Sequence, residues 1–355
     1  MPTTPLRRGW TTGSCATAAA KAAWSLLVRG EAPDPVTITL PGGQDVAFAL
    51  DSLGAGSGRA WASVIKDAGD DPDVTHGAQI RVDVECAPRG SGIRFRAGEG
   101  VGTITLPGLP LPPGEPAINP VPRAMIRTAL EQITPQGADA VVTVSIADGA
   151  RLAEKTLNAR LGILGGLSVL GTTGIVVPYS CSAWIHSIHR GVDVARAGGL
   201  THIAGSTGAT SEGAISALYA LPEIALIEMG DFAGGFLKYM RRHPVPRLTI
   251  AGGLAKMTKL AQGHLDLHSS RTLADPAALS ILAAPLGLSA TQHEALRNAA
   301  SIAQGYADLG DARLGTLIAR SAARKAREIL DDPSCGLDVV VFDRQGRMLG
   351  RSDVG

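Results

Sequence analysis

The sequence predicts two domains: an α+β domain at residues 1–150 and an α/β domain with a mostly parallel sheet at residues 151–355. In the first half, short alternating apolar runs are separated by turn residues, as in hairpins. The second half holds four runs rich in Val, Ile and Leu with helix-like segments between them, which is typical of buried parallel strands. These runs are residues 167–170, 201–204, 224–229 and 248–251.

Bulk composition narrows the functional classes. The formal net charge is +1 and no basic stripe alternates with aromatic residues, which argues against a nucleic-acid partner. No long apolar region follows Arg7 and Arg8, so we expect no signal peptide here, and the alanine-rich stretch at residues 16–28 is too short to span a membrane. We therefore expect a soluble cytoplasmic protein. Its cysteines form no CxxC pair, which favours reduced thiols over a zinc site; they are Cys15, Cys86, Cys181 and Cys335.

A helix with a capped start is predicted at residues 16–28, where alanines predominate. Gly30 suits the left-handed position after its end. Thr11, Thr12 and Ser14 precede the helix, and their hydroxyls are typical caps. The N–H groups at such a start bind an anion or a carboxylate, although a purely structural capped helix is the alternative.

The rest of the first half reads as strands with one helix. Residues 36–40 and 45–50 flank a Pro-Gly-Gly-Gln turn and predict a hairpin. The glycine-rich run at residues 98–102 is not followed by a helix, so it does not match a dinucleotide fingerprint. A helix is expected at residues 124–133, and further strands at residues 59–65, 80–85, 93–96 and 140–146.

An acid-rich loop follows the strand at residues 59–65. Residues 67–76 contain four aspartates and a histidine, which are Asp67, Asp70, Asp71, Asp73 and His76. Crowded carboxylates raise one another's pKa, which suits a general base. Clustered carboxylates also suit Mg²⁺ or Ca²⁺, but the spacing lacks the EF-hand pattern. A solvated loop rich in Asx turns is the remaining alternative.

Two segments near the domain boundary offer groups for a polar ligand. Residues 107–122 hold seven prolines and predict a stiff, extended loop. This loop presents Glu115, Asn119 and Arg123. Further on, Lys155 and Arg160 are placed to bind carboxylates across a cleft between domains. Ordinary connectors with surface charges are the alternative.

Each apolar run of the second half is followed at once by glycine. Parallel strands present their carboxyl ends at one edge, and ligands bind in the crevice there. Glycine lets a ligand approach the backbone closely, although ordinary tight turns are the alternative. The expected edge comprises Gly171, Thr172, Thr173, Gly174, Gly205, Ser206, Thr207, Gly208, Gly230, Asp231, Gly252 and Gly253.

The chain beyond the fourth run is mostly helical. Lys256 and Lys259 follow that run directly. His264 and His268 have helical spacing, but their neighbours do not match a zinc protease motif. We expect helices over residues 275–330 and a closing hairpin from residue 337 to residue 349.

Taken together, these segments resemble the CbiD family, the cobalt-precorrin-5B C1-methyltransferases of cobalamin (vitamin B12) biosynthesis. The resemblance spans about residues 6–270 and keeps the family's order of blocks. It is carried by residues 8–15, 66–77, 98–102, 114–123, 155–162 and 165–178. The fold that it implies is an α+β domain joined to a Rossmann-like one.

The resemblance implies transfer of a methyl group from S-adenosylmethionine to C1 of (cobalt-)precorrin-5B, giving (cobalt-)precorrin-6A. The methyl donor then occupies the glycine edge. The many carboxylates of a tetrapyrrole substrate require basic and polar partners. The candidates are Thr11, Thr12, Ser14, Glu115, Asn119, Arg123, Lys155, Asn158, Arg160, Lys256 and Lys259. A base to remove a macrocycle proton is sought among Asp70, Asp71, Asp73 and His76.

Two other functions stay open at this point. The chain departs from the family pattern at residues 178–181 and 205–208, so it is alternatively a corrinoid-binding or channelling protein without catalysis. The acid-rich loop leaves a metal-dependent enzyme as a third hypothesis, although no Walker-type loop accompanies it. Neighbouring enzymes of the pathway and a second copy of the chain are further expected partners.

Overall fold

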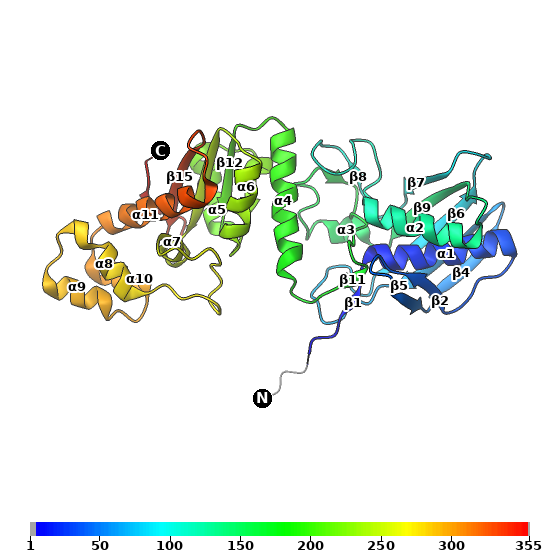
Figure 1. The fold of residues 1–355 in the computed structure, drawn as a ribbon, viewed down its shortest axis with the longest axis horizontal. Coiled ribbons are helices and arrows are strands. Elements are labelled where there is room, and N and C mark those ends of the chain that lie inside the picture. Colours follow the sequence, from blue (N-terminus) through cyan, green and yellow to red (C-terminus); the bar gives the residue numbers. More distant parts are fainter. Residues whose placement is uncertain (1–4, 354–355) are drawn as a thin grey trace. The chain divides into compact units, whose positions relative to one another are not determined.

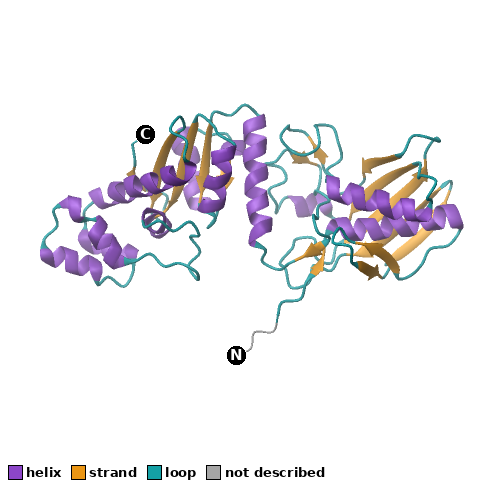
Figure 2. Cartoon of the chain, in the orientation of Figure 1, coloured by secondary structure: helices purple, strands orange, loops and turns teal. Residues whose placement is uncertain are grey.

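The structure is a computed structural model that describes residues 5–353. It is a mixed α/β protein whose chain forms two compact units, Met1–Ser180 (unit 1) and Cys181–Gly355 (unit 2). Each unit contains its own five-stranded sheet (Figures 1 and 2). The division falls later than residue 150, where the sequence placed it, because two short strands after that residue pair within unit 1. They are β10 (Ile163–Leu164), which pairs with β8 (Thr103–Ile104), and β11 (Ile175–Val176), which pairs with β1 (Gly9–Trp10).

The sheet of unit 1 follows the alternation of its sequence. In β6 (Gln79–Cys86) and β9 (Ala140–Ile146), every second residue is buried. All neighbouring strands are antiparallel except β7 and β9, which are parallel. The order is β4 (Ser52–Gly56), β5 (Arg59–Ile65), β6, β9 and β7 (Ile93–Ala97), and the predicted hairpin is β2 (Val36–Thr39) with β3 (Asp45–Phe48).

Two helices cover one face of this sheet. They are α1 (Thr12–Arg29) and α2 (Pro120–Ile133), which lie side by side (Figure 1). Six alanines of α1 have no exposed surface, because their small side chains let the helix lie directly on the strands. The short helix α3 (Gly149–Ala153) follows β9.

The sheet of unit 2 has four parallel strands and one antiparallel edge strand. Its order is β13 (Leu226–Glu228), β12 (His202–Ser206), β14 (Arg247–Gly253), β15 (Gly336–Phe342) and β16 (Met348–Arg351). On one face, α4 (Cys181–Ala197), α6 (Ala233–Arg242), α7 (Leu254–Ala261) and α11 (Arg313–Leu330) contribute to the larger core. On the other face, α5 (Ala209–Tyr219) covers a smaller core.

The region from residue 275 to residue 330 is helical, as the sequence predicted. It contains α8 (Pro276–Leu282), α9 (Ala290–Arg297) and α10 (Ile302–Leu309) in addition to α11. Two 3₁₀ turns, η1 (Glu223–Ala225) and η2 (Ala284–Leu286), complete unit 2. Between residues 5 and 353, no helix combines the length and the apolar character needed to cross a membrane.

One of the four apolar runs does not belong to the parallel sheet. Residues 167–170 lie in unit 1 and form isolated parallel bridges there, Val101 with Leu167 and Ile118 with Val169. Leu167 and Val169 are buried, whereas Leu170 is exposed. The prediction of a fourth strand was wrong because an apolar run specifies burial but not the backbone beside which it lies. Residues 171–174 therefore belong to unit 1 and do not follow a strand of the parallel sheet in unit 2.

Candidate functional site

The carboxyl edge of the parallel sheet in unit 2 is the best-defined candidate site. In the sheet, β12 lies next to β14. After β12 the chain passes through α5 to β13, on one side of this pair, and after β14 it leads to β15, on the other side. The connections thus diverge between the adjacent strands β12 and β14, and ligands bind at such a switch point. Ser206 ends β12, and Gly253 ends β14. The sequence predicted both positions.

Lys256 on α7 links the loops at this edge. Its Nζ donates a hydrogen bond to the main-chain oxygen of Thr207 at 2.9 Å and lies 3.0 Å from Asp231 Oδ1. Thr207 follows β12, Asp231 follows β13, and Lys256 follows β14. One ammonium group therefore ties together three loops. Since a third of its side chain is exposed, its charge is still accessible to a ligand.

The glycines of this edge divide into two groups. A Cβ added at Gly205 would overlap the ring of Phe236, and one at Gly252 would overlap Met257 and Thr207, so these two glycines serve packing within the protein. In contrast, nothing lies within 4 Å of a Cβ built at Gly208 or Gly253. The open part of the edge is thus narrower than the sequence predicted, and it lies beside Gly208 and Gly253.

Lys259 does not reach the open edge. It is 5% exposed, and its Nζ donates to the main-chain oxygen of Leu267 at 2.7 Å. The sequence placed it among the substrate-binding groups, but the structure turns it inward. An ammonium group buried against a carbonyl holds the loop after α7 in place.

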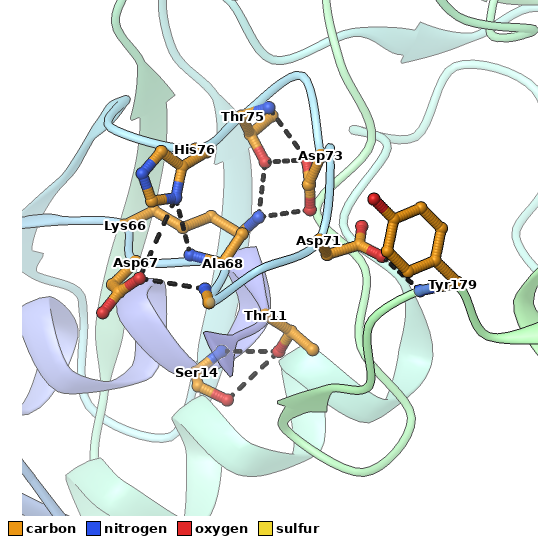
Figure 3. Close-up of polar contacts among 11 residues, drawn as sticks. Thr11, Ser14, Lys66, Asp67, Ala68, Asp71, Asp73, Thr75, His76 and Tyr179 are labelled. Atoms are coloured by element: carbon orange, nitrogen blue, oxygen red, sulfur yellow. Dashed lines mark hydrogen bonds and ion pairs between the residues drawn. The ribbon is translucent and has the colours of Figure 1, made fainter. Parts of the chain in front are cut away.

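In unit 1, the acid-rich loop is organised around a buried lysine that the sequence did not single out as a site residue (Figure 3). Lys66 is 1% exposed, and its Nζ forms an ion pair with Asp73 and a 2.6 Å hydrogen bond to Thr75 Oγ1. Burial raises the pKa of Asp73, but the charge of Lys66 and hydrogen bonds from Lys66 and Thr75 outweigh it and lower the pKa overall. A lone lysine directly before an acid cluster was the signal for this pair.

The other predicted bases each make a bond within unit 1. Asp70 Oδ2 accepts the main-chain N–H of Arg7 at 2.6 Å, and Asp71 Oδ1 accepts that of Tyr179 at 2.8 Å. His76 Nδ1 accepts the main-chain N–H of Ala68 at 3.1 Å. Because that bond uses the Nδ1 lone pair, the neutral ring carries its proton on Nε2.

Asp67 closes the loop against the N-terminal segment. Arg7 forms an ion pair with it, and the main-chain N–H of Gly69 donates to it at 2.9 Å. The hydrogen bond from Arg7 lowers the pKa of Asp67 to about 2. Between residues 5 and 353, no three His, Cys, Asp or Glu side chains come together as metal ligands would. The loop is thus a hydrogen-bonded turn anchored to residues 7–10.

The start of α1 is closed by the chain itself. Thr11 Oγ1 accepts the N–H of Ser14 at 3.2 Å, the N–H of Gly13 donates to the oxygen of Leu170, and Ser14 Oγ donates to the oxygen of Gly174 at 2.7 Å. Thr11, Thr12 and Ser14 are buried. The expectation that this helix start offers its N–H groups to a ligand is corrected, because Leu170 accepts the N–H of Gly13 and Thr11 accepts the N–H of Ser14.

The same loop accounts for two glycines that the sequence placed at the sheet edge. A Cβ at Gly171 would overlap Thr11, and one at Gly174 would crowd Leu40 and Ser14. Both glycines therefore allow the loop to close over α1. Thr172 and Thr173, between them, are exposed.

The proline-rich loop also turns its cation inward. The guanidinium of Arg123 donates to the oxygens of Ile118 at 2.7 Å and Pro116 at 3.0 Å, and it pairs with Glu115 at 2.8 Å. Arg123 is 9% exposed. The prediction that Arg123 and Glu115 bind substrate is replaced by a structural role, because this guanidinium already serves three acceptors in its own loop. Asn119 caps α2 without a side-chain hydrogen bond.

The boundary segment retains accessible polar groups. Lys155 is exposed, and Arg160 is half-buried. Asn158 Nδ2 lies 3.4 Å from the oxygen of Gly166, so this amide supports the turn after α3. Of the basic candidates in unit 1, Lys155 is the most accessible.

The fold is that of a mixed α/β protein, and the parallel sheet of unit 2 has a switch point at its carboxyl edge, which is where other α/β proteins bind small molecules. Comparison with known families identifies the family of this chain. The CbiD family model matches residues 2–178, and the model "CbiD, C-terminal domain" matches residues 266–353. The chain belongs to the CbiD family.

Similar proteins carry one shared name. The chain is 59% identical to the cobalt-precorrin-5B C(1)-methyltransferase of Agrobacterium fabrum, over 98% of this chain and 93% of that protein. It is 57% identical to the protein of the same name from Methylorubrum extorquens, over 97% of both chains. A crystal structure of a cobalamin biosynthesis protein (CbiD) from Archaeoglobus fulgidus is 30% identical, covering 75% of this chain and 83% of that one, with a TM-score of 0.41.

Proposed function

We propose that this protein is a cobalt-precorrin-5B C(1)-methyltransferase that takes its methyl group from S-adenosylmethionine. The observation that carries the proposal is the 59% identity to a relative of that name over 98% of this chain. The methylation of a tetrapyrrole ring carbon belongs to the cytoplasmic synthesis of the corrin ring. No observation favours a binding or channelling protein that lacks this activity.

We place the methyl donor at the carboxyl edge of the sheet in unit 2, where Rossmann-like domains bind their ligands. Gly208 and Gly253 leave room beside the backbone. Lys256 and Asp231 present opposite charges, which match the carboxylate and the ammonium group of a methionine moiety. S-adenosylmethionine supplies an electrophilic methyl group on a sulfonium centre. The task of the edge is to hold that group in line with the substrate carbon.

The substrate carries many carboxylates, and the accessible cations are their expected partners. Lys155 is exposed, and Arg160 is half-buried, in the turn after α3. Arg123 and Lys259 contribute indirectly, because each stiffens a loop rather than offering a free charge.

Any proton that must leave the macrocycle needs an acceptor. Asp73 is a poor one, since its ion pair with Lys66 lowers its pKa. His76 has committed its Nδ1 lone pair to the main chain. Asp70 and Asp71 therefore remain the candidates, because each carboxylate still has oxygen lone pairs beyond its single main-chain bond.

The test combines binding and turnover. Calorimetric titration of S-adenosylhomocysteine into the purified protein should show saturable binding, and incubation with S-adenosylmethionine and a precorrin-5B-type substrate should yield the C1-methylated product. Gly253→Val should weaken donor binding while the protein stays folded, because its new side chain projects into the open edge. Neither binding nor methylation by the folded wild-type protein would refute the proposal. Association with pathway enzymes or with a second copy stays a prediction.

A further inference from the structure

Glu228 lies at the donor edge, although the sequence did not mark it as a site residue. It is the last residue of β13, and it stands opposite Ser206 in the parallel pairing of β12 and β13. The main-chain N–H groups of Met229 and Gly230 both donate to the oxygen of Ser206, at 2.9 and 3.2 Å. These bonds fix the backbone that follows Glu228 against the end of β12.

The carboxylate of Glu228 is not used by the fold. Glu228 is half-buried, and its side chain forms no hydrogen bond or ion pair with any residue from 5 to 353. The other acidic groups nearby are engaged: Asp231 Oδ1 lies 3.0 Å from Lys256 Nζ, and Glu212 accepts from Ser206 Oγ at 3.3 Å. The carboxylate of Glu228 is therefore available to a ligand at this edge.

We propose that Glu228 binds the ribose hydroxyls of the methyl donor. This inference rests on the proposed function. A vicinal diol offers two O–H donors to one carboxylate, and an acidic side chain some twenty residues beyond a glycine turn, at the same sheet edge, is suited to that contact. Gly208 provides the open turn on the neighbouring strand, and Glu228 provides the acceptor. Asp231 and Lys256 then remain for the charged end of the donor.

The experiment compares S-adenosylhomocysteine with its 2′-deoxy and 3′-deoxy analogues by calorimetric titration. Wild-type protein should bind the parent compound about 10-fold or more tightly than either analogue, since each lacks one charge-assisted hydrogen bond. Glu228→Gln should weaken binding of the parent compound by about 10- to 100-fold and binding of each analogue by less, because each analogue keeps only one hydroxyl that can donate to the carboxylate. Glu294→Gln, on α9, is the matched control and should change neither.

The outcomes separate the two proposals. If wild-type protein binds S-adenosylhomocysteine and both deoxy analogues equally well, the proposed role of Glu228 is wrong. The methyltransferase proposal is not affected by that result. A Glu228→Gln protein that keeps the full preference for the diol overturns it as well. Wild-type protein that binds none of the three compounds overturns the role of Glu228, and the methylation assay then decides the methyltransferase proposal separately. Thermal unfolding of each variant, followed by circular dichroism, verifies that the proteins compared are folded.

Discussion

Asp71 holds Tyr179 in a left-handed backbone conformation: its Oδ1 accepts the main-chain N–H of Tyr179 at 2.8 Å, and Tyr179 has a φ of +55°. Tyr179 is 68% exposed, so packing of its ring does not offset the cost of this conformation. The bond spans 108 positions in the sequence. It connects the acid-rich loop to the end of unit 1.

This relationship predicts opposite effects for two substitutions. Tyr179→Gly should leave the free energy of unfolding unchanged or raise it by about 1 kcal/mol, because glycine adopts positive φ without strain. Asp71→Ala should lower it by about 1 kcal/mol through loss of the hydrogen bond. Urea unfolding measures both. A loss of several kcal/mol for Tyr179→Gly would show that the ring packs against the protein after all.

The pair of Lys66 and Asp73 should be the most sensitive point of the acid-rich loop. Asp73→Asn leaves the buried ammonium of Lys66 without its counter-charge, which should cost about 3 kcal/mol of stability. Asp70→Asn is the control, because Asp70 is exposed and its amide replacement still accepts the bond from Arg7. Urea unfolding of the two variants should differ clearly, and equal stabilities would contradict a structural role for the pair.

The same loop predicts how stability depends on pH. The pKa values of Asp73 and Asp67 are lower in the folded chain than in the unfolded chain, where an aspartate has a pKa near ~3.9. The folded state therefore binds fewer protons, and the stability that these groups contribute is complete above that value and is lost as pH falls through the folded values. As the pH drops below about 4, the melting temperature should decrease, and it should decrease less steeply in Asp73→Asn than in the wild type. Parallel curves would count against the ion pair.

Glycines of the donor edge should respond differently to alanine. Gly205→Ala places a Cβ into the ring of Phe236 and should cost about 1–3 kcal/mol. Gly253→Ala meets nothing within 4 Å at a residue with φ −70° and should leave the melting temperature nearly unchanged. Differential scanning calorimetry compares the pair. A large loss for Gly253→Ala would mean that the edge is closed rather than open.

Lys256 should matter for the donor more than for folding. Lys256→Met keeps the length of the side chain and removes the charge that lies beside Asp231 and Thr207, so S-adenosylhomocysteine should bind about 10-fold more weakly. Lys238→Met, on the exposed surface of α6, serves as the control in the same titration. Unchanged affinity in Lys256→Met would place the donor elsewhere.

Several elements of the fold were predictable from local pattern. Alternation specified β6 and β9, because a period of two puts every second side chain into the core. Three of the four apolar runs became β12, β13 and β14, and the turns that follow them lie at one edge, as parallel strands require. The resemblance to the CbiD family also needed only the ordered blocks of residues, and the comparisons confirmed it.

The sequence by itself determined most of the strands and helices, the apolar faces that form the cores, and the family. Only the tertiary structure decided that residues 167–170 stay with unit 1 and that Arg123 and Lys259 point inward. It also decided that the start of α1 is closed by Leu170 and Gly174. The physical reason is that the spacing of apolar residues, which favours a strand or a helix and its buried face, is set by residues close together in the sequence. A strand, a carbonyl group or a charged side chain finds its partner among residues that are distant in the sequence. The local sequence does not distinguish between these possible partners.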